Sequence, residues 1–263
     1  MNIDAIKKKL DGLQGNKTSK KEKTDYTKIF WKPKEAGEYK IRFVPNAKNA
    51  DSPFEEVLVH YGVNKFPMYA LSNWGEEDPI HNFAKEIWNN GDEEEKKLAK
   101  TLFPKTRVMA PIVVRGEEEK GVRWMEMGIG MYKDLLAIAT DEDYMDYEDI
   151  TNGRDFKVNA VPDTLPNGRS FISLSLIPRP KSTPLSEDAK LAEKWLNDQP
   201  DYLSVQRKYS SDEMKEILKK YITPENEITE EEGAGMNGPS EPKEKETKSN
   251  KFDSMFEDED APF

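Results

Sequence analysis

Aromatic and cationic residues alternate through the first half of this 263-residue sequence. Flat rings can stack on nucleic-acid bases, with a gain of about 1–3 kcal/mol for each base, while Lys and Arg follow the phosphates. Binding a single strand without sequence preference requires both kinds of side chain. The candidates for DNA contact are Lys40, Arg42, Phe66, Tyr69, Trp74, Lys105, Arg107, Arg115, Arg123, Trp124 and Tyr132.

The spacing of the rings separates core candidates from surface candidates. Aromatic residues at helical or alternating spacing usually belong to a core, which is how we interpret Phe43, Phe83 and Trp88. Phe66, Tyr69 and Trp74 lie instead in the irregular stretch "NKFPMYALSNWGEED". We expect these last three rings to be exposed.

Residues suited to catalysis or metal binding are scarce. The sequence contains no cysteine and only two histidines, His60 and His81. The acidic stretch "DEDYMDYEDITNG" has Met145 at the fifth position, where a calcium loop requires an oxygen ligand. No catalytic constellation is apparent, so the sequence favours a binding protein without an enzymatic activity.

The candidate DNA-contact residues must be positioned by the strands and helices of the chain, and these are short and follow one another in no regular order. The patterns predict strands over 37–46, 54–62, 107–115, 121–128, 155–161 and 169–178, and helices over 79–90, 92–103, 131–140, 185–198 and 210–222. Regular βαβ alternation is missing. We therefore expect a mainly β protein with α insertions: an OB-fold-like, five-stranded antiparallel barrel with a helical subdomain near 78–103.

Two helix starts have clear capping signals. Asp78 can cap a helix whose first position is Pro79 and whose stop is Gly91. Ser210 and Glu213 have the spacing of a capping box.

Charge divides the chain into three parts. Residues 1–45 contain 12 basic and 6 acidic residues, whereas residues 224–263 contain 4 basic and 13 acidic ones, within a total net charge of −11. Charge blocks of this kind often serve as interaction arms. We predict a basic, flexible N-terminal arm over 1–24, a core over 25–223 and a disordered acidic tail over 224–263.

The sequence has no apolar run near the roughly 20 residues that cross a bilayer, and its start lacks the apolar region of a secretory signal. We expect a soluble, intracellular protein that does not bind membranes.

Several segments resemble, in order, the single-stranded DNA-binding protein of large tailed phages, the gene 32 type. The segment "EYKIRFVPNAKNADSPFEEVLVHYG" is similar to the start of that family's core. Three later segments continue the likeness: "KTRVMAPIVV", "EKGVRWMEMGIGMYKDLLAIA" and the hairpin "DFKVNAV…RSFISLSLIPRPKSTPL". Together they extend over about residues 1–223.

The resemblance implies cooperative, sequence-independent binding of single-stranded DNA in phage replication, recombination and repair, in the cytoplasm of the infected bacterial host. It implies that the arm mediates self-association along DNA and that "KTSKK" is its motif; Lys105, Thr106 and Arg107 resemble an internal copy. The acidic tail would recruit polymerase, primase, helicase loader and recombinase. The arm candidates are Lys7, Lys8, Lys9, Lys17, Thr18, Ser19, Lys20 and Lys21.

The acidic tip with a final Pro-Phe resembles the tail of bacterial single-strand binding proteins, whose last ring docks on partner enzymes. One desolvated ring can anchor a segment that charge steers to its partner. The partner-binding candidates are Phe256, Asp258, Glu259, Asp260, Pro262 and Phe263.

One departure from the phage family concerns metal. That family usually holds zinc through three cysteines and a histidine, and "EDPIH" stands where its paired cysteines would be expected. Asp78 and His81 could bind a metal in principle, but the apolar stripe from Ile80 to Trp88 offers packing as a simpler staple. We expect no zinc and no other cofactor.

Two other function classes stay open at this stage. Carboxylate-rich loops could serve a metal-dependent DNA enzyme, which metal-dependent strand cleavage would reveal. The charged ends could instead belong to a protein–protein adaptor, which failure to bind any oligonucleotide would favour.

Overall fold

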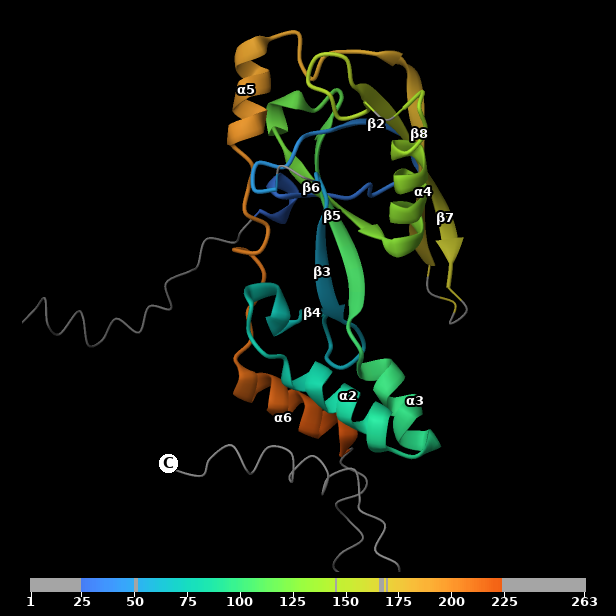
Figure 1. Ribbon diagram of the computed structural model, residues 1–263, viewed down its shortest axis with the longest axis vertical. Coiled ribbons are helices and arrows are strands. Elements are labelled where there is room, and N and C mark those ends of the chain that lie inside the picture. Colours follow the sequence, from blue (N-terminus) through green and yellow to red (C-terminus); the bar gives the residue numbers. More distant parts are fainter. Residues whose placement is uncertain (1–24, 50–51, 145, 166–167, 169, 224–263) are drawn as a thin grey trace, which may run out of the picture.

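The structure is a computed structural model that describes residues 25–49, 52–144, 146–165, 168 and 170–223 (Figure 1). Within these ranges, no helix is both long and apolar enough to cross a lipid bilayer. Most strands gather at one end of the molecule, which we call the sheet half. The helical lobe at the other end is joined to it by strands β3 (Glu55–His60) and β5 (Lys105–Val114).

One eight-stranded sheet has the order β1-β6-β5-β2-β7-β8, and β3 and β4 branch off through β5. β3 and β2 share one edge of β5, because β3 pairs with residues 105–109 and β2 with residues 112–114. The pair of β1 and β6 is parallel, and the other described pairs are antiparallel. The remaining strands are β1 (Phe30–Trp31), β2 (Gly37–Phe43), β4 (Met68–Tyr69), β6 (Arg123–Gly128), β7 (Arg154–Thr164) and β8 (Ser170–Ser182).

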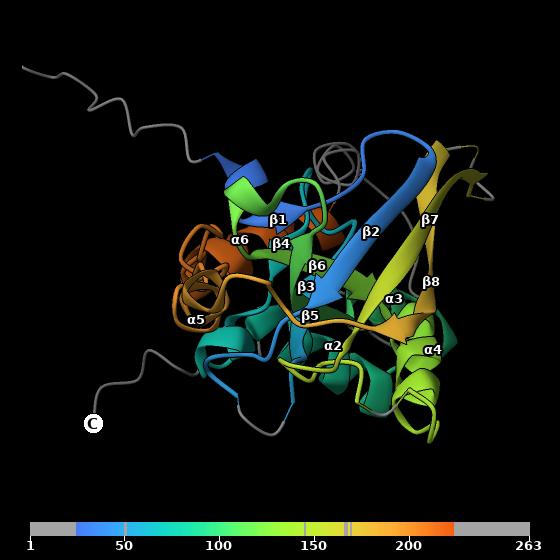
Figure 2. The ribbon, with the colours of Figure 1, turned by 90° about the horizontal axis from the view of Figure 1, so that it is seen from above.

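The main core lies inside the curl of this sheet. In the view from above, β1 and the β7–β8 pair stand on opposite sides of β2 (Figure 2). The ring of Phe43 meets those of Phe54, Tyr147 and Phe156 edge to face, at centroid distances of 6.2, 5.8 and 5.0 Å. Helix α4 (Ile129–Ala139) packs Leu135 against the same cluster.

The second face of β2 is also covered at the end of the strand. Helix α5 (Ala189–Asn197) places Trp195 and Ala192 against Val44 and Val113. Ile41, Arg42 and Phe43 are buried in succession, with Arg42 bonded to the carbonyls of Asp149 and Thr183, whereas the alternating pattern predicted one exposed face. The end of this strand, from Ile41 to Phe43, is therefore withdrawn from solvent, whereas its first half is mostly exposed.

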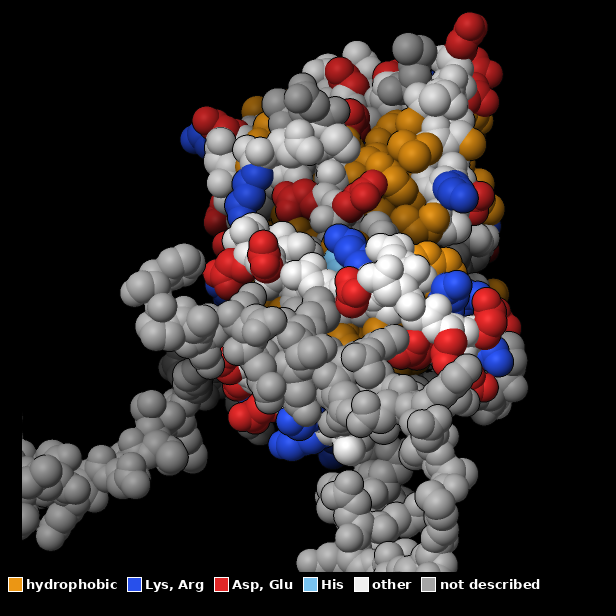
Figure 3. All heavy atoms as spheres, turned by 60° about the horizontal axis from the view of Figure 1, so that its bottom comes forward, with side chains coloured by type: hydrophobic (Ala, Val, Ile, Leu, Met, Phe, Trp, Pro, Cys, Tyr) orange, Lys and Arg blue, Asp and Glu red, His pale blue; other side chains and the backbone are white. Residues whose placement is uncertain are grey.

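The helical lobe consists of α2 (Pro79–Asn90), α3 (Glu93–Leu102), α6 (Ser211–Ile222) and the 3₁₀ helix η2 (Leu71–Trp74). Apolar stripes of the three α-helices form one cluster around Phe83 and Leu218. Asp78 caps α2 and Gly91 ends it, as predicted, and the predicted capping box starts α6. Apolar side chains on this underside lie among Lys, Arg, Asp and Glu (Figure 3).

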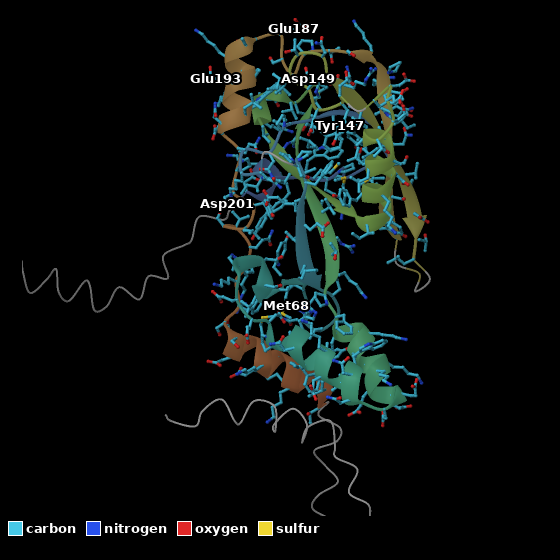
Figure 4. The ribbon with its side chains drawn as sticks, viewed as in Figure 1. Met68, Tyr147, Asp149, Glu187, Glu193 and Asp201 are labelled. Atoms are coloured by element: carbon cyan, nitrogen blue, oxygen red, sulfur yellow. The ribbon has the colours of Figure 1, made fainter. Side chains whose placement is uncertain are left out.

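Residues 198–210, which we call the connector, link α5 in the sheet half to α6 in the helical lobe. The hydroxyl of Tyr202 donates to Glu55 Oε2 at 2.6 Å, and the indole of Trp124 donates to the carbonyl of Pro200 at 2.7 Å. Figure 4 shows Asp201 on the connector, between Tyr147 in the sheet half and Met68 in the helical lobe. These two bonds hold the connector against the sheet half, and Lys208 pairs with Glu76 next to the helical lobe.

The mainly β class with α insertions is confirmed, and every predicted strand and helix corresponds to an observed element. The strand count is not five, because short β1 and β4 and the branch through β5 enlarge the sheet. The described pairings include one parallel pair and no closing pair between β1 and β8. Assignment to the OB class stays a prediction.

Candidate nucleic-acid interface

A groove of about 1160 Å³ opens between the two outer strands of the curled sheet. One wall comes from β1 and the preceding 3₁₀ helix η1 (Tyr26–Lys28), and the other from the tip of the β7–β8 hairpin. Rings and cations line it together: Tyr26, Phe30, Trp31, Tyr39, Phe171, Lys32, Lys34, Arg107, Lys120 and Arg123.

Several of these rings present surface to the groove. Tyr26 is 52% exposed and Phe171 is 39% exposed, and the Tyr26 and Phe30 rings stack at 6.4 Å. Trp31 is buried with its edge against Tyr39 and forms part of the floor. Exposed rings beside lysines are the combination that holds an unstacked strand.

Arg107 connects this groove to a second set of rings. Its guanidinium lies 4.9 Å above the ring of Tyr61, and its Nε donates to the Tyr61 hydroxyl at 2.9 Å. Glu126 Oε1 lies 3.3 Å from the same Nε. Burial, followed by the charge of Glu126, raises the pKa of Tyr61, so this ring stays a neutral phenol.

The rings continue from Tyr61 toward the helical lobe. Tyr61 and Tyr69 pack against the same cluster of buried side chains, and Tyr69 and Trp74 lie 6.5 Å apart. Lys208, from the connector, lies 5.8 Å above the Trp74 ring and pairs with Glu76. We call Tyr61, Tyr69, Trp74, Arg107 and Lys208 the aromatic path.

The structure thus brings three predicted residues together, namely Tyr69, Trp74 and Arg107. The Tyr69 and Trp74 rings were expected to be exposed but are half-buried, because Tyr69 packs on a buried cluster and Lys208 lies over Trp74. Phe66 is 66% exposed beside Lys65, and Lys105 is exposed at the start of β5. Tyr132 is half-buried on α4 and packs its edge on Phe54 at 5.2 Å, away from the path.

The predicted basic face of β2 is instead an internal ion cluster around Asp155. This buried carboxylate contacts Lys40 at 2.9 Å, Arg115 at 2.9 Å and Arg42 at 3.6 Å. Arg42 is fully buried and donates to the carbonyls of Asp149 and Thr183. Burial lowers its pKa to about 10. Because a strand cannot reach Arg42 without opening this cluster, Arg42 does not belong to the interface. Arg115 is mostly buried in the same cluster, with 17% of its side chain exposed. The Lys40 side chain is 48% exposed, and its contact with DNA stays a prediction.

Arg123 and Trp124 also serve the interior. Arg123 is 4% exposed and pairs with Glu117 at 2.5 Å, although it borders the groove. Trp124 is 1% exposed, with its ring 4.7 Å from Tyr202. In "VRWM", the basic residue Arg123 therefore forms an ion pair and the aromatic residue Trp124 belongs to the core.

Sequence reasoning missed the residues that tertiary structure adds, chiefly Tyr26, Phe30, Tyr61, Phe171 and Lys208. Tyr26 and Phe30 follow the basic arm directly, which was an available signal. Phe171 and Lys208 come from segments far along the chain, and nothing in their local sequence places them beside Phe30 or Trp74.

The residues near Asp78 do not fit a zinc site. Both ring nitrogens of His60 are used: Nδ1 lies 2.9 Å from the carbonyl of Leu102, and Nε2 lies 3.2 Å from the Asp78 carboxylate. Asp78 accepts from the amides of Leu71 and His81. No group of three or more potential ligands occurs within the described ranges, and the full sequence contains no cysteine.

The arm and tail candidates, from Lys7 to Lys21 and from Phe256 to Phe263, lie outside the described residues. A comparison with curated proteins found no match. The family described as gp32 DNA binding protein like matches residues 35–222, which include β2 to α6. This match covers most of the chain and supports single-stranded DNA as its ligand. The chain therefore belongs to the gp32-like family, a family of DNA-binding proteins and not of enzymes.

Proposed function

We propose that this protein coats single-stranded DNA cooperatively, without sequence preference, during phage DNA replication, recombination and repair. The observation that carries the proposal is the continuity of the groove and the aromatic path, which meet at Arg107. Membership of the gp32-like family supports the same ligand.

The geometry explains why a single strand would be preferred over a duplex. Stacking on Tyr26, Phe171 or Trp74 requires a base whose face is free, and duplex bases cover each other's faces. Ring faces accept any base, so this mode of binding carries little sequence information. Lys32, Lys34 and Lys120 would follow the phosphates, which makes affinity fall with salt.

The charged ends complete the proposal. The basic arm would contact the next protein along the strand and thereby produce cooperativity. The acidic tail would recruit polymerase, primase, helicase loader or recombinase through Phe263, in the cytoplasm of a phage-infected bacterium. Between uses, the tail's carboxylates would compete with DNA for cations of the groove.

We also propose that the core folds without zinc. The packing of α2, α3 and α6, together with the His60–Asp78 pair, would stabilise the helical lobe in place of a metal. Unchanged thermal stability after exhaustive chelation would support this view, and a chelator-dependent loss of structure would contradict it.

A titration with poly(dT), followed by intrinsic tryptophan fluorescence at low and high salt, tests the function. We expect saturable quenching that weakens as salt rises, because phosphate contacts release counterions. A chain that binds neither poly(dT) nor mixed-sequence single strands by a second method would contradict the proposal.

A further inference from the structure

Glu126 places a carboxylate at the junction of the groove and the aromatic path. It lies on β6, two residues before Gly128, the partner of Arg107 in β5. Because alternate residues share a face, Glu126 and Arg107 point to the same side. Glu126 Oε1 is 3.3 Å from Arg107 Nε and 3.5 Å from the Tyr61 hydroxyl.

The carboxylate faces the guanidinium as a strand phosphate would. Both groups offer anionic oxygens that accept charge-assisted hydrogen bonds from arginine. Both partners also remain accessible, with 48% of the Glu126 side chain and 31% of the Arg107 side chain exposed. An exposed pair is weak enough for an incoming phosphate to displace.

We propose, on the basis of the proposed function, that Glu126 is a built-in competitor of the strand at Arg107. In the free protein it holds the guanidinium flat on Tyr61. On binding, a phosphate takes the arginine and Glu126 turns to solvent. Glu126 is thus a positioning residue that weakens binding and keeps release easy.

The consequence is measurable in affinity and in its salt dependence. Glu126→Gln should tighten binding by about two- to fivefold at low salt, the range that an exposed ion pair represents. The slope of log affinity against log salt should steepen by up to about 0.7, because in the wild type the freed carboxylate of Glu126 takes up a counterion that offsets the one released by the phosphate at Arg107. Glu126→Asp, which keeps the charge, should stay closer to the wild type.

The experiment is a salt series of fluorescence anisotropy titrations, with the full chain and a labelled dT oligonucleotide that spans one binding site. Arg107→Gln and the double variant close a mutant cycle, in which Glu126→Gln should give no gain once Arg107 is absent. Glu38→Gln is the matched control, because it removes the same charge from the exposed pair with Lys157 outside the groove.

Three results would overturn the inference. Weaker binding by Glu126→Gln would make Glu126 a contact of the strand, and an equal gain in Glu38→Gln would reduce the effect to net charge. Unchanged affinity together with an unchanged salt slope would also refute it. In each case the wild type still binds, so this failure is distinct from that of the proposed function, where the wild type would not bind. Thermal melting of every variant verifies the fold.

Discussion

Asp155 is the shared counterion of three cationic side chains in the sheet half. Burial alone would raise its pKa, but hydrogen bonds from Arg115 and Lys40 outweigh burial and lower it. Arg42, with no exposed surface, relies on the same carboxylate and on backbone carbonyls. Removing the charge of Asp155 leaves a buried guanidinium without its counterion.

We expect Asp155→Asn to reduce the free energy of unfolding by about 3–5 kcal/mol at pH 7. Because the pKa of Asp155 is lowered in the folded state, its contribution is present above about pH 4 and is lost as pH falls through the folded-state pKa. The variant should therefore lose less stability on acidification than the wild type. Urea unfolding between pH 7 and pH 3 tests both statements, and parallel pH curves would contradict the second.

Trp74, which is half-buried, and Trp88, which is exposed, are two indoles that can be compared directly. Trp74 lies in the aromatic path beneath Lys208, whereas Trp88 is 40% exposed on α2, against Phe103 and Lys100, and outside the path. Trp88 was expected in the core, but its ring lies at the surface of the helical lobe.

Trp74→Ala should weaken binding to a dT oligonucleotide by about 1–3 kcal/mol, the gain of one stacked base, and Trp88→Ala should leave affinity unchanged. Anisotropy titrations of both variants at one salt concentration give the comparison. Equal losses in the two variants would show that the strand does not follow the path.

At the scale of elements, the start of α2 depends on one carboxylate. Asp78 accepts from His60, from the α2 amide of His81 and from Leu71 at the start of η2. Burial would raise the pKa of Asp78, but the hydrogen bond and charge of His60 and the two amides lower it. Both ring nitrogens of His60 are engaged, one with the carbonyl of Leu102 and the other with the carboxylate of Asp78.

Asp78→Asn retains one acceptor oxygen for the helix cap and removes the carboxylate that faces His60. We expect a loss of about 2–4 kcal/mol in the stability of the helical lobe at neutral pH. Since the folded-state pKa of Asp78 is lowered, the loss should shrink below about pH 4. Amide hydrogen exchange should quicken in α2, α3 and α6 more than in β7 and β8. Uniform acceleration would contradict a local role.

At the scale of the whole molecule, charge is distributed along the chain and not only around the groove. Residues 224–263 contain 13 acidic and 4 basic residues, so removing them changes the net charge from −11 to −2. Truncation after Thr223 should therefore tighten binding of single-stranded DNA, most clearly at low salt where screening is weak. Phe263→Ala should leave DNA affinity unchanged and lose partner capture. Unaltered affinity of the truncated chain would contradict competition by the tail.

The basic arm allows a separate test of cooperativity. Deleting residues 1–21 should reduce clustering on long poly(dT) while the affinity for an oligonucleotide of one site changes much less. Titrations on long and short strands separate the two quantities. Unchanged clustering with equal site affinity would refute the assignment of the arm.

Local sequence was sufficient for the elements and for part of the site. Periodicity predicted the five described α-helices, and capping signals predicted the starts of α2 and α6, because capping side chains lie within a few residues of the amides they serve. Tyr69, Trp74 and Arg107 were predicted from irregular or basic stretches. The alternation of apolar and polar residues in β2 predicted one exposed face and therefore placed Arg42 at the surface. Arg42 is buried, because the sequence of one strand does not indicate which other segments cover its second face.

The sequence by itself determined the family, the mainly β class, the position of each α-helix along the chain and the separation of charge, since all of these are local or additive properties. Only the tertiary structure decided which rings and cations share a surface. The groove joins β1 to the tip of the β7–β8 hairpin, and the aromatic path joins β3 and η2 to Lys208 of the connector. Contacts between segments so distant in sequence arise from how the sheet curls and what packs on each face, and both depend on the entire chain.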